Sequence, residues 1–271
     1  MKPVKIFIFG VLLTATVLGT TAFINAGLLD KANGGDKGFA VIELYTSEGC
    51  SSCPPADQLV AKIEKEVKDK PVYILAYHVD YWDRLGWKDV FSNADYSKRQ
   101  YDYARYLHLQ SVYTPQIVVN GKTEFTGSEE GTLRNAIKTN LEKTTPGRLS
   151  LNVSGVDKDQ AGIKYTIEGV DKNTVLQIAV LQKNAQTKVG HGENGGHTLS
   201  HVQIVRGLQK VSLKGNDGIV KIKLPQGFDA QAWEIIGFLQ NTTNGVIIGA
   251  AKATLPNELS TNAPAAAKNP K

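Results

Sequence analysis

The chain has 271 residues with a formal net charge of +5, 41% hydrophobic and 21% charged residues, and two cysteines. These values are those of an ordinary globular protein, and no basic stripe with interleaved aromatic residues leads us to expect nucleic-acid binding. The length favours two modest domains over one, and no cofactor is expected.

The first residues carry the pattern of a targeting segment. Lys2 and Lys5 precede an apolar run of 19 residues, Ile6–Ile24, which contains no charge. A charged start, an apolar run and nearby small residues are typical of a signal peptide, here with cleavage after Ala22 or Ala26. The run is also long enough for an uncleaved membrane anchor. Both alternatives predict an exported protein (periplasmic, secreted or membrane-anchored) that meets a membrane only through this segment, in a compartment where disulfides persist.

Strand and helix patterns alternate over residues 39–147, after a polar linker at residues 27–38. An Asn-Gly pair at residues 120–121 predicts a tight hairpin turn. The predicted elements, in chain order, are a strand at 39–45, a helix opening at Pro54, a strand at 71–79, a helix at 95–109, hairpin strands at 117–119 and 123–126, and a helix from 128 to about 143.

Cys50 and Cys53 lie between the first strand and its helix. Residues three apart in a helical turn are about 5–6 Å apart, which suits a disulfide. Helix-start N–H groups stabilise a thiolate, the nucleophile of disulfide exchange. Pro54 and Pro55 follow directly, so the helix is expected to begin at Pro54 with Cys53 as its cap, which weakens the dipole effect on Cys50. The pattern favours a redox site.

Two other interpretations of the cysteine pair stay open. A structural bridge around so short a loop would stabilise the fold by only about 2 kcal/mol. A zinc site would need further ligands, and the sequence holds no second CxxC pair. No metal ligand is therefore assigned from this pattern.

His78 and Asp80 follow the second predicted strand. Parallel strands end at the same edge of a sheet, so these residues are expected near the cysteines. A charged His78 would lower a cysteine pKa, and a neutral one could relay a proton. The alternative is a His78 bonded to the backbone with Asp80 at the surface.

The order of elements around the CxxC pair resembles the thioredoxin fold. Four segments, VIELYTSEGCSSCPPAD, YHVDYWDRLGWKD, VYTPQIVVNG and GENGGHTLSHVQIVRGL, resemble a family of secreted thioredoxin-like proteins catalogued as a domain of unknown function. The resemblance covers most of residues 39–250. It implies the fold and export, but no established substrate.

The resemblance also implies roles for single residues. Cys50 would be the nucleophile and Cys53 the resolving thiol. Pro115, after Thr114, would be a cis-proline that docks an extended substrate, although it could instead simply begin an edge strand. Glu43 is the nearest counterpart of a buried acid that assists proton transfer, one position further from the first cysteine than is usual.

Residues 148–254 change to short apolar runs separated by Gly, Asn and Asp turns, which predict an all-β, sandwich-like domain. A tail at 255–271 is expected to be disordered. The loop His191–His197, with His201, could bind a metal, but packing against the first domain is favoured. The predicted strands are 149–153, 162–168, 175–181, 202–211, 218–224, 234–240 and 246–252.

The sequence thus predicts an α/β protein: a thioredoxin-like domain with an inserted helical segment, then an all-β sandwich-like domain. Its expected function is that of an exported thiol–disulfide oxidoreductase or redox-linked protein, with protein or small-molecule thiols and disulfides as partners. One alternative is a non-catalytic envelope binding protein that uses the aromatic surface around Tyr81, Trp82 and Trp87. Another is a metal carrier that uses Cys50, Cys53 and His78.

Overall fold

The computed structural model describes residues 38–145, 147–157, 159–226, 228–229 and 231–254. The predicted leader and tail lie outside the described residues, as does the predicted linker before Gly38. Within the described part of the chain, no helix is long and apolar enough to cross a membrane.

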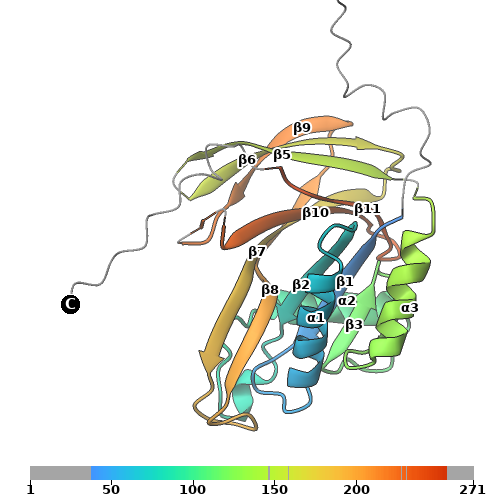
Figure 1. The fold of residues 1–271 in the computed structure, drawn as a ribbon. Helices are drawn as coiled ribbons and strands as arrows, with labels where there is room; N and C mark the ends of the chain where they lie inside the picture. Colours follow the sequence, from blue (N-terminus) through green and yellow to red (C-terminus); the bar gives the residue numbers. More distant parts are fainter. Residues whose placement is uncertain (1–37, 146, 158, 227, 230, 255–271) are drawn as a thin grey trace, which may run out of the picture. The chain divides into compact units, whose positions relative to one another are not determined.

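The predicted elements are confirmed in type and order (Figure 1). Helix α1 begins at Pro54 with Cys53 as its cap, as expected. The elements of the described residues are β1 (Ala40–Thr46), α1 (Pro54–Glu66), β2 (Val72–His78), the 3₁₀ helix η2 (Asp83–Leu85), α2 (Ala94–Tyr106), β3 (Gln116–Val119), β4 (Thr123–Thr126), α3 (Glu130–Leu141), β5 (Arg148–Asp157), β6 (Gln160–Glu168), β7 (Thr174–Lys188), β8 (Thr198–Ser212), β9 (Asp217–Lys223), β10 (Trp233–Asn241) and β11 (Ile247–Lys252).

The predicted fold class is wrong. Within the described residues, strands from both halves of the chain join one mixed eight-stranded sheet in the order β11-β10-β7-β8-β2-β1-β3-β4. The protein is therefore mostly β and is not a thioredoxin-like domain followed by a sandwich. The junction is a parallel contact between β2 and β8, where Ala76 pairs with Ile204. Apolar periodicity identifies a strand but not its neighbour, which is why the sequence pattern did not reveal this shared sheet.

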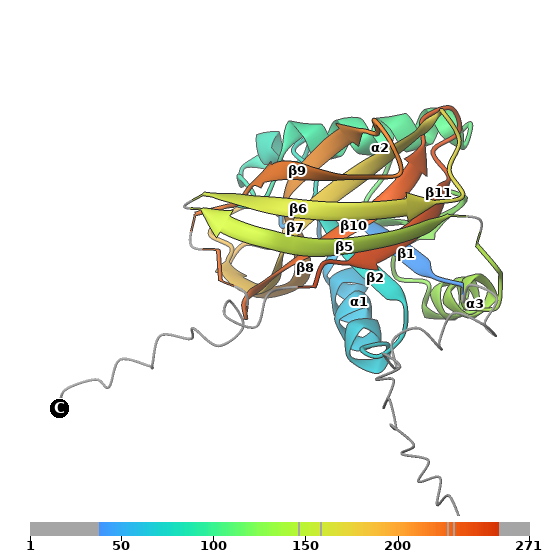
Figure 2. The same cartoon turned by 90° about the horizontal axis from the view of Figure 1, so that it is seen from above.

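A second sheet, β5-β6-β9, lies over the part of the large sheet formed by β7, β10 and β11 (Figures 1 and 2). Alternate residues of β5 and β6 point toward β7 and β10, as a half-buried strand requires. Leu151, Ile163, Ile178 and Ile235 meet in this core. Residues 148–254 therefore supply both the covering sheet and half of the main sheet.

Strand β1 separates two further cores because its side chains alternate between the faces of the sheet. Ile42 and Leu44 pack with α1 and α3. Val41 and Tyr45 face the other way, toward α2 and the strands β7 and β10. Helices thus cover both faces of β1, and its carboxyl end emerges between them, directly before the cysteines.

Candidate functional site

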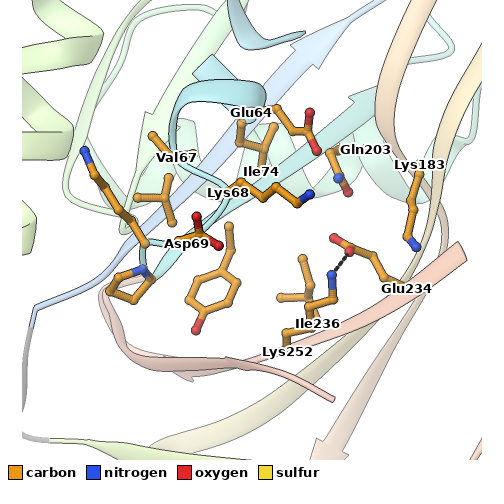
Figure 3. A pocket seen from close by; sticks show the side chains of 14 residues that line it. Glu64, Val67, Lys68, Asp69, Ile74, Lys183, Gln203, Glu234, Ile236 and Lys252 are labelled. Atoms are coloured by element: carbon orange, nitrogen blue, oxygen red, sulfur yellow. Dashed lines mark hydrogen bonds and ion pairs between the residues drawn. The ribbon is translucent and has the colours of Figure 1, made fainter. Parts of the chain in front are cut away.

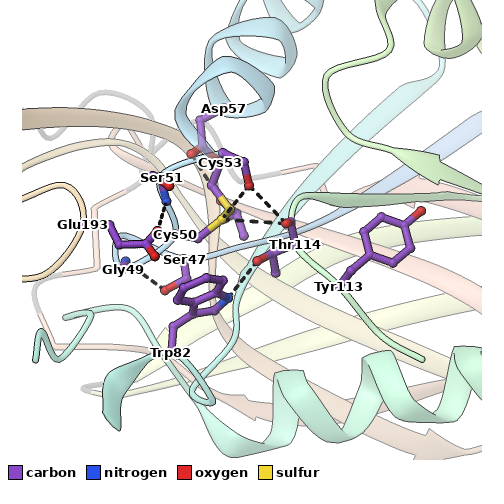
Figure 4. Close-up of a disulfide and its surroundings, with 12 residues drawn as sticks. Ser47, Gly49, Cys50, Ser51, Cys53, Asp57, Trp82, Tyr113, Thr114 and Glu193 are labelled. Carbon is purple, nitrogen blue, oxygen red and sulfur yellow. Dashed lines mark hydrogen bonds between the residues drawn. A yellow bond between two sulfur atoms is a disulfide. The ribbon is translucent and has the colours of Figure 1, made fainter. Parts of the chain in front are cut away.

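The cysteines form a disulfide at the start of α1 (Figure 4). Their Cα atoms are 5.4 Å apart, and the Cys53 carbonyl accepts the N–H groups of Ala56 (2.9 Å) and Asp57 (3.1 Å). Both cysteines are 0% exposed, whereas the intervening Ser51 and Ser52 are exposed. The disulfide therefore lies just beneath the surface, covered by neighbouring segments.

The loop before β3 forms one wall of the site. The Thr114–Pro115 peptide bond is cis, as the family resemblance implied. Cys50 Sγ lies 3.8 Å from the Thr114 carbonyl oxygen, and the Ser52 hydroxyl donates to that oxygen at 3.4 Å. Trp82 Nε1–H donates to Thr114 Oγ1 at 2.8 Å. The structure thus brings Thr114 and Pro115 beside the cysteines.

His78 lies at the end of β2, fully buried, with Nδ1 2.6 Å from Asp89 Oδ2. The same carboxylate oxygen accepts the Glu48 N–H at 2.8 Å. Burial would raise the pKa of Asp89, but the nearby His78 and the hydrogen bonds that Asp89 accepts hold it below its usual value. His78 is therefore bonded to a carboxylate that also holds the loop before Cys50.

Asp57 is a site residue that the sequence prediction missed. It lies on the first turn of α1, four residues after Cys53, and accepts a hydrogen bond from Thr46 at 3.2 Å. Burial raises the pKa of Asp57 to about 7, while His201 and the Thr46 hydroxyl oppose the rise. The spacing of four was the available signal, because residues i and i+4 share one face of a helix.

His201, on β8, joins Asp57 to a second buried acid. Its Nδ1 is 4.0 Å from Asp57 Oδ2, and its Nε2 is 3.6 Å from Glu48 Oε1. Its ring also meets the His78 ring edge to face, with centroids 4.8 Å apart. A buried cluster of two histidines and three carboxyl groups therefore adjoins the disulfide. Even so, no group of three or more His, Cys, Asp or Glu side chains in the described part is arranged to hold a metal ion.

The structure does not bring Glu43 or Asp80 to this cluster. Glu43 lies on the opposite face of β1 from Thr46, where it accepts from Arg99 Nε at 2.7 Å and from the Tyr103 hydroxyl. Asp80 is bound through its backbone and side chain to Ser97 on α2. Both acids connect α2 to the sheet.

The turn between β7 and β8 closes over the cysteines from the other side. Glu193 Oε2 accepts the Ser51 N–H at 2.9 Å. Asn194 Nδ2 donates to the carbonyl oxygens of Glu48 and Cys50, both at 2.9 Å. The glycine-rich motif thus packs against the CxxC segment, which agrees with the packing role favoured for it.

A separate cavity of about 550 Å³ lies among α1, β2, β8 and β10 (Figure 3). Both lysine and acidic side chains line this cavity, and Glu234 forms an ion pair with Lys252. Among the described residues, the buried Gln203 Oε1 there has no hydrogen-bond partner. None of the cysteine-site residues lines this cavity, so it is not part of the candidate site.

A family model described as "Protein of unknown function (DUF1223)" matches residues 41–240. The chain is similar to a protein of Agrobacterium tumefaciens known from a crystal structure, with 27% identity and a TM-score of 0.61 over 82% of this chain and 95% of that one. It also shares its fold with HBP35 of Porphyromonas gingivalis, with 17% identity and a TM-score of 0.58 over 88% and 82% of the two chains. No curated protein matches it.

Proposed function

The chain belongs to the DUF1223 family of proteins of unknown function, and from its own site we propose that it is an exported thiol–disulfide oxidoreductase. The carrying observation is the oxidised Cys50–Cys53 pair at the start of α1, with Cys50 Sγ 3.8 Å from the carbonyl oxygen that precedes cis-Pro115. The charged and apolar N-terminal pattern supports export. Export agrees with the disulfide, because disulfides persist outside the cytosol.

Exchange begins from the reduced pair in the direction that reduces a substrate. The Cys50 thiolate attacks one sulfur of a substrate disulfide, and a bond forms between Cys50 Sγ and that sulfur. The substrate S–S bond breaks, and its other sulfur leaves as a thiolate. The product of this step is a mixed disulfide between Cys50 and the substrate.

Cys53 then resolves the mixed disulfide. Its thiol loses a proton, its sulfur attacks Cys50 Sγ, and the second substrate sulfur leaves as a thiolate. Two electrons have passed to the substrate, and the Cys50–Cys53 bond is restored. The reverse sequence oxidises a substrate dithiol, so direction depends on the potential of the partner.

Asp57 is the group we assign as proton acceptor for Cys53. It lies one helical turn beyond Cys53 and is buried, and its pKa of about 7 suits proton exchange near neutral pH. His201 Nδ1 lies 4.0 Å from Asp57 Oδ2, and His201 Nε2 lies 3.6 Å from Glu48 Oε1, so polar side chains continue from Asp57 into the interior. His78 contributes by holding Asp89.

The substrate would bind at Thr114 and Pro115. The loop before β3 presents a backbone carbonyl beside Cys50 Sγ, and an extended peptide can pair with the backbone groups of such a loop. Protein or small-molecule disulfides and thiols are the corresponding partner class.

The experiment is a measurement of the Cys50–Cys53 reduction potential by thiol trapping in glutathione buffers. A potential above about −230 mV, together with a trapped mixed disulfide in the Cys53→Ser variant, would support exchange chemistry. A potential below about −300 mV with no trapped intermediate would identify a structural bridge.

A second candidate is a non-catalytic binding protein with a structural disulfide. The observation that favours it is the complete burial of both cysteines, since exchange requires an attacking sulfur to reach one of them. In that case Cys50→Ser would reduce stability and leave every cellular function intact.

A further inference from the structure

The turn that joins β7 to β8 has a defined conformation over the CxxC segment. Its two strands pair up to Lys188 and Thr198. Inside the turn, Val189 N–H donates to the His197 carbonyl at 2.9 Å and Gly196 N–H to the Val189 carbonyl at 2.8 Å. These bonds hold Glu193 and Asn194, the two residues at the tip of the turn, in one position.

Glu193 and Asn194, at that tip, make different contacts. The buried Asn194 ties the turn to two carbonyl oxygens, one of them that of Cys50. Glu193 is exposed, and its carboxylate accepts the N–H of Ser51, the residue directly after Cys50 (Figure 4). The hydrogen bonds from the Ser51 hydroxyl and N–H lower the pKa of Glu193, so it is an anion at neutral pH.

A carboxylate at this position opposes a thiolate on Cys50. Backbone N–H groups beside the first cysteine stabilise its thiolate, and Glu193 occupies the first of them. The fixed negative charge adds like-charge repulsion, which raises the pKa of a neighbouring acid. Neither effect acts on the uncharged disulfide, so both act only on the reduced protein.

We propose that Glu193 sets the redox poise of the Cys50–Cys53 pair through the Ser51 N–H, and that the Glu193–Asn194 turn is a clasp that reduction loosens. This inference rests on the proposed function. Coupling is reciprocal: because the closed clasp disfavours the Cys50 thiolate, the thiolate disfavours the closed clasp by the same factor. The same motion uncovers the buried cysteines for a substrate.

The test compares wild type with Glu193→Gln, Glu193→Ala and the control Glu142→Gln. Glu142 is an exposed acid after the end of α3, the helix that starts near the site and runs 12 residues, about 18 Å, away from it. Each variant is equilibrated with reduced and oxidised glutathione, which exchanges two glutathione thiols for one glutathione disulfide. The Cys50 thiol pKa is read from the pH dependence of alkylation.

We expect Glu193→Gln to shift the equilibrium toward the reduced pair by about three- to tenfold, about 14–30 mV more positive, with a lower Cys50 thiol pKa. Glu193→Ala should shift it further, because the Ser51 N–H is then free for the thiolate. The control should match wild type. An unchanged potential and thiol pKa in both Glu193 variants would overturn the inference while leaving a measurable, exchange-active pair. Failure of the wild-type pair to exchange at all would instead overturn the proposed function.

A second measurement follows the clasp itself. Hydrogen exchange at residues 189–197 should become faster on reduction of wild type. In Asn194→Ala, hydrogen exchange at these residues should already be fast in the oxidised protein, and dithiothreitol should reduce the disulfide more rapidly than in wild type. Equal exchange in the oxidised and reduced protein would contradict a clasp that responds to reduction.

Discussion

His201 Nδ1 lies 4.0 Å from the carboxylate of Asp57, which connects β8 to the first turn of the helix that Cys53 caps. Both side chains are buried, and His201 also faces Glu48. In a water-poor interior, a change of charge on one group alters the proton affinity of its neighbours. Chemistry at Cys53 and the protonation of Asp57 are therefore expected to depend on each other.

Asp57→Asn should stabilise the protein at alkaline pH. Burial raises the pKa of Asp57 from 3.8 to about 7, so the native state holds this proton more tightly than the unfolded chain. Stability contributed by the protonated acid is therefore present below about pH 4 and lost as pH rises through about 7. At pH 8 the variant should gain on the order of 4 kcal/mol in free energy of unfolding, with no gain at pH 4.

Urea unfolding between pH 4 and 8 would measure this difference. The matched control is Asp69→Asn, an exposed acid in the loop after α1, which should leave the pH profile unchanged. Parallel profiles for wild type and Asp57→Asn would contradict a buried, proton-binding Asp57.

The same Asp57→Asn variant should slow resolution of the mixed disulfide. Without a proton acceptor beside Cys53, the rate at pH 7 should fall about 10²-fold, the usual contribution of general base catalysis. The defect should shrink toward pH 9, where a free thiol ionises by itself. Stopped-flow decay of a preformed mixed disulfide gives the rate, and equal rates at pH 7 would exclude Asp57 from this step.

Glu43→Gln should destabilise the fold without changing the redox potential. The change removes the carboxylate partner of the buried Arg99 guanidinium. In this pair the Glu43 side chain is 0% exposed and the Arg99 side chain is 9% exposed. Breaking such a pair costs about 3–5 kcal/mol. Thermal unfolding and glutathione equilibration would be measured together.

The double variant Glu43→Leu with Arg99→Met serves as its control, because it removes both charges and should recover much of the lost stability. A threefold or larger change in the redox equilibrium of Glu43→Gln would show that Glu43 does influence the cysteine pair.

Thr114→Val should destabilise the loop before β3 that lies beside the disulfide. It removes the acceptor of Trp82 Nε1–H and should cost about 1 kcal/mol, with a raised KM for a peptide disulfide. Thr114→Ser keeps the hydroxyl and is the matched control. If Val and Ser at this position behave alike, the Trp82 contact does not position the substrate loop.

Much of this protein could be predicted from local pattern. Period-two apolar runs and the Asn-Gly turn identified the strands and the β3–β4 hairpin, in which Asn120 and Gly121 both have positive φ. The CxxC spacing and the prolines after it located the disulfide and the start of α1. Each of these features depends on residues a few positions apart, so the sequence carries it directly.

The tertiary structure decided what distant segments do to one another. Pairing of β2 with β8 merged two expected domains into one sheet, and the same pairing placed His201 beside Asp57 and Glu193 beside Ser51. The face of β1 assigned Glu43 to Arg99 rather than to the cysteines. A strand pattern states which residues are apolar, but strand order, and with it the set of buried charges around the disulfide, arises only when the whole chain packs.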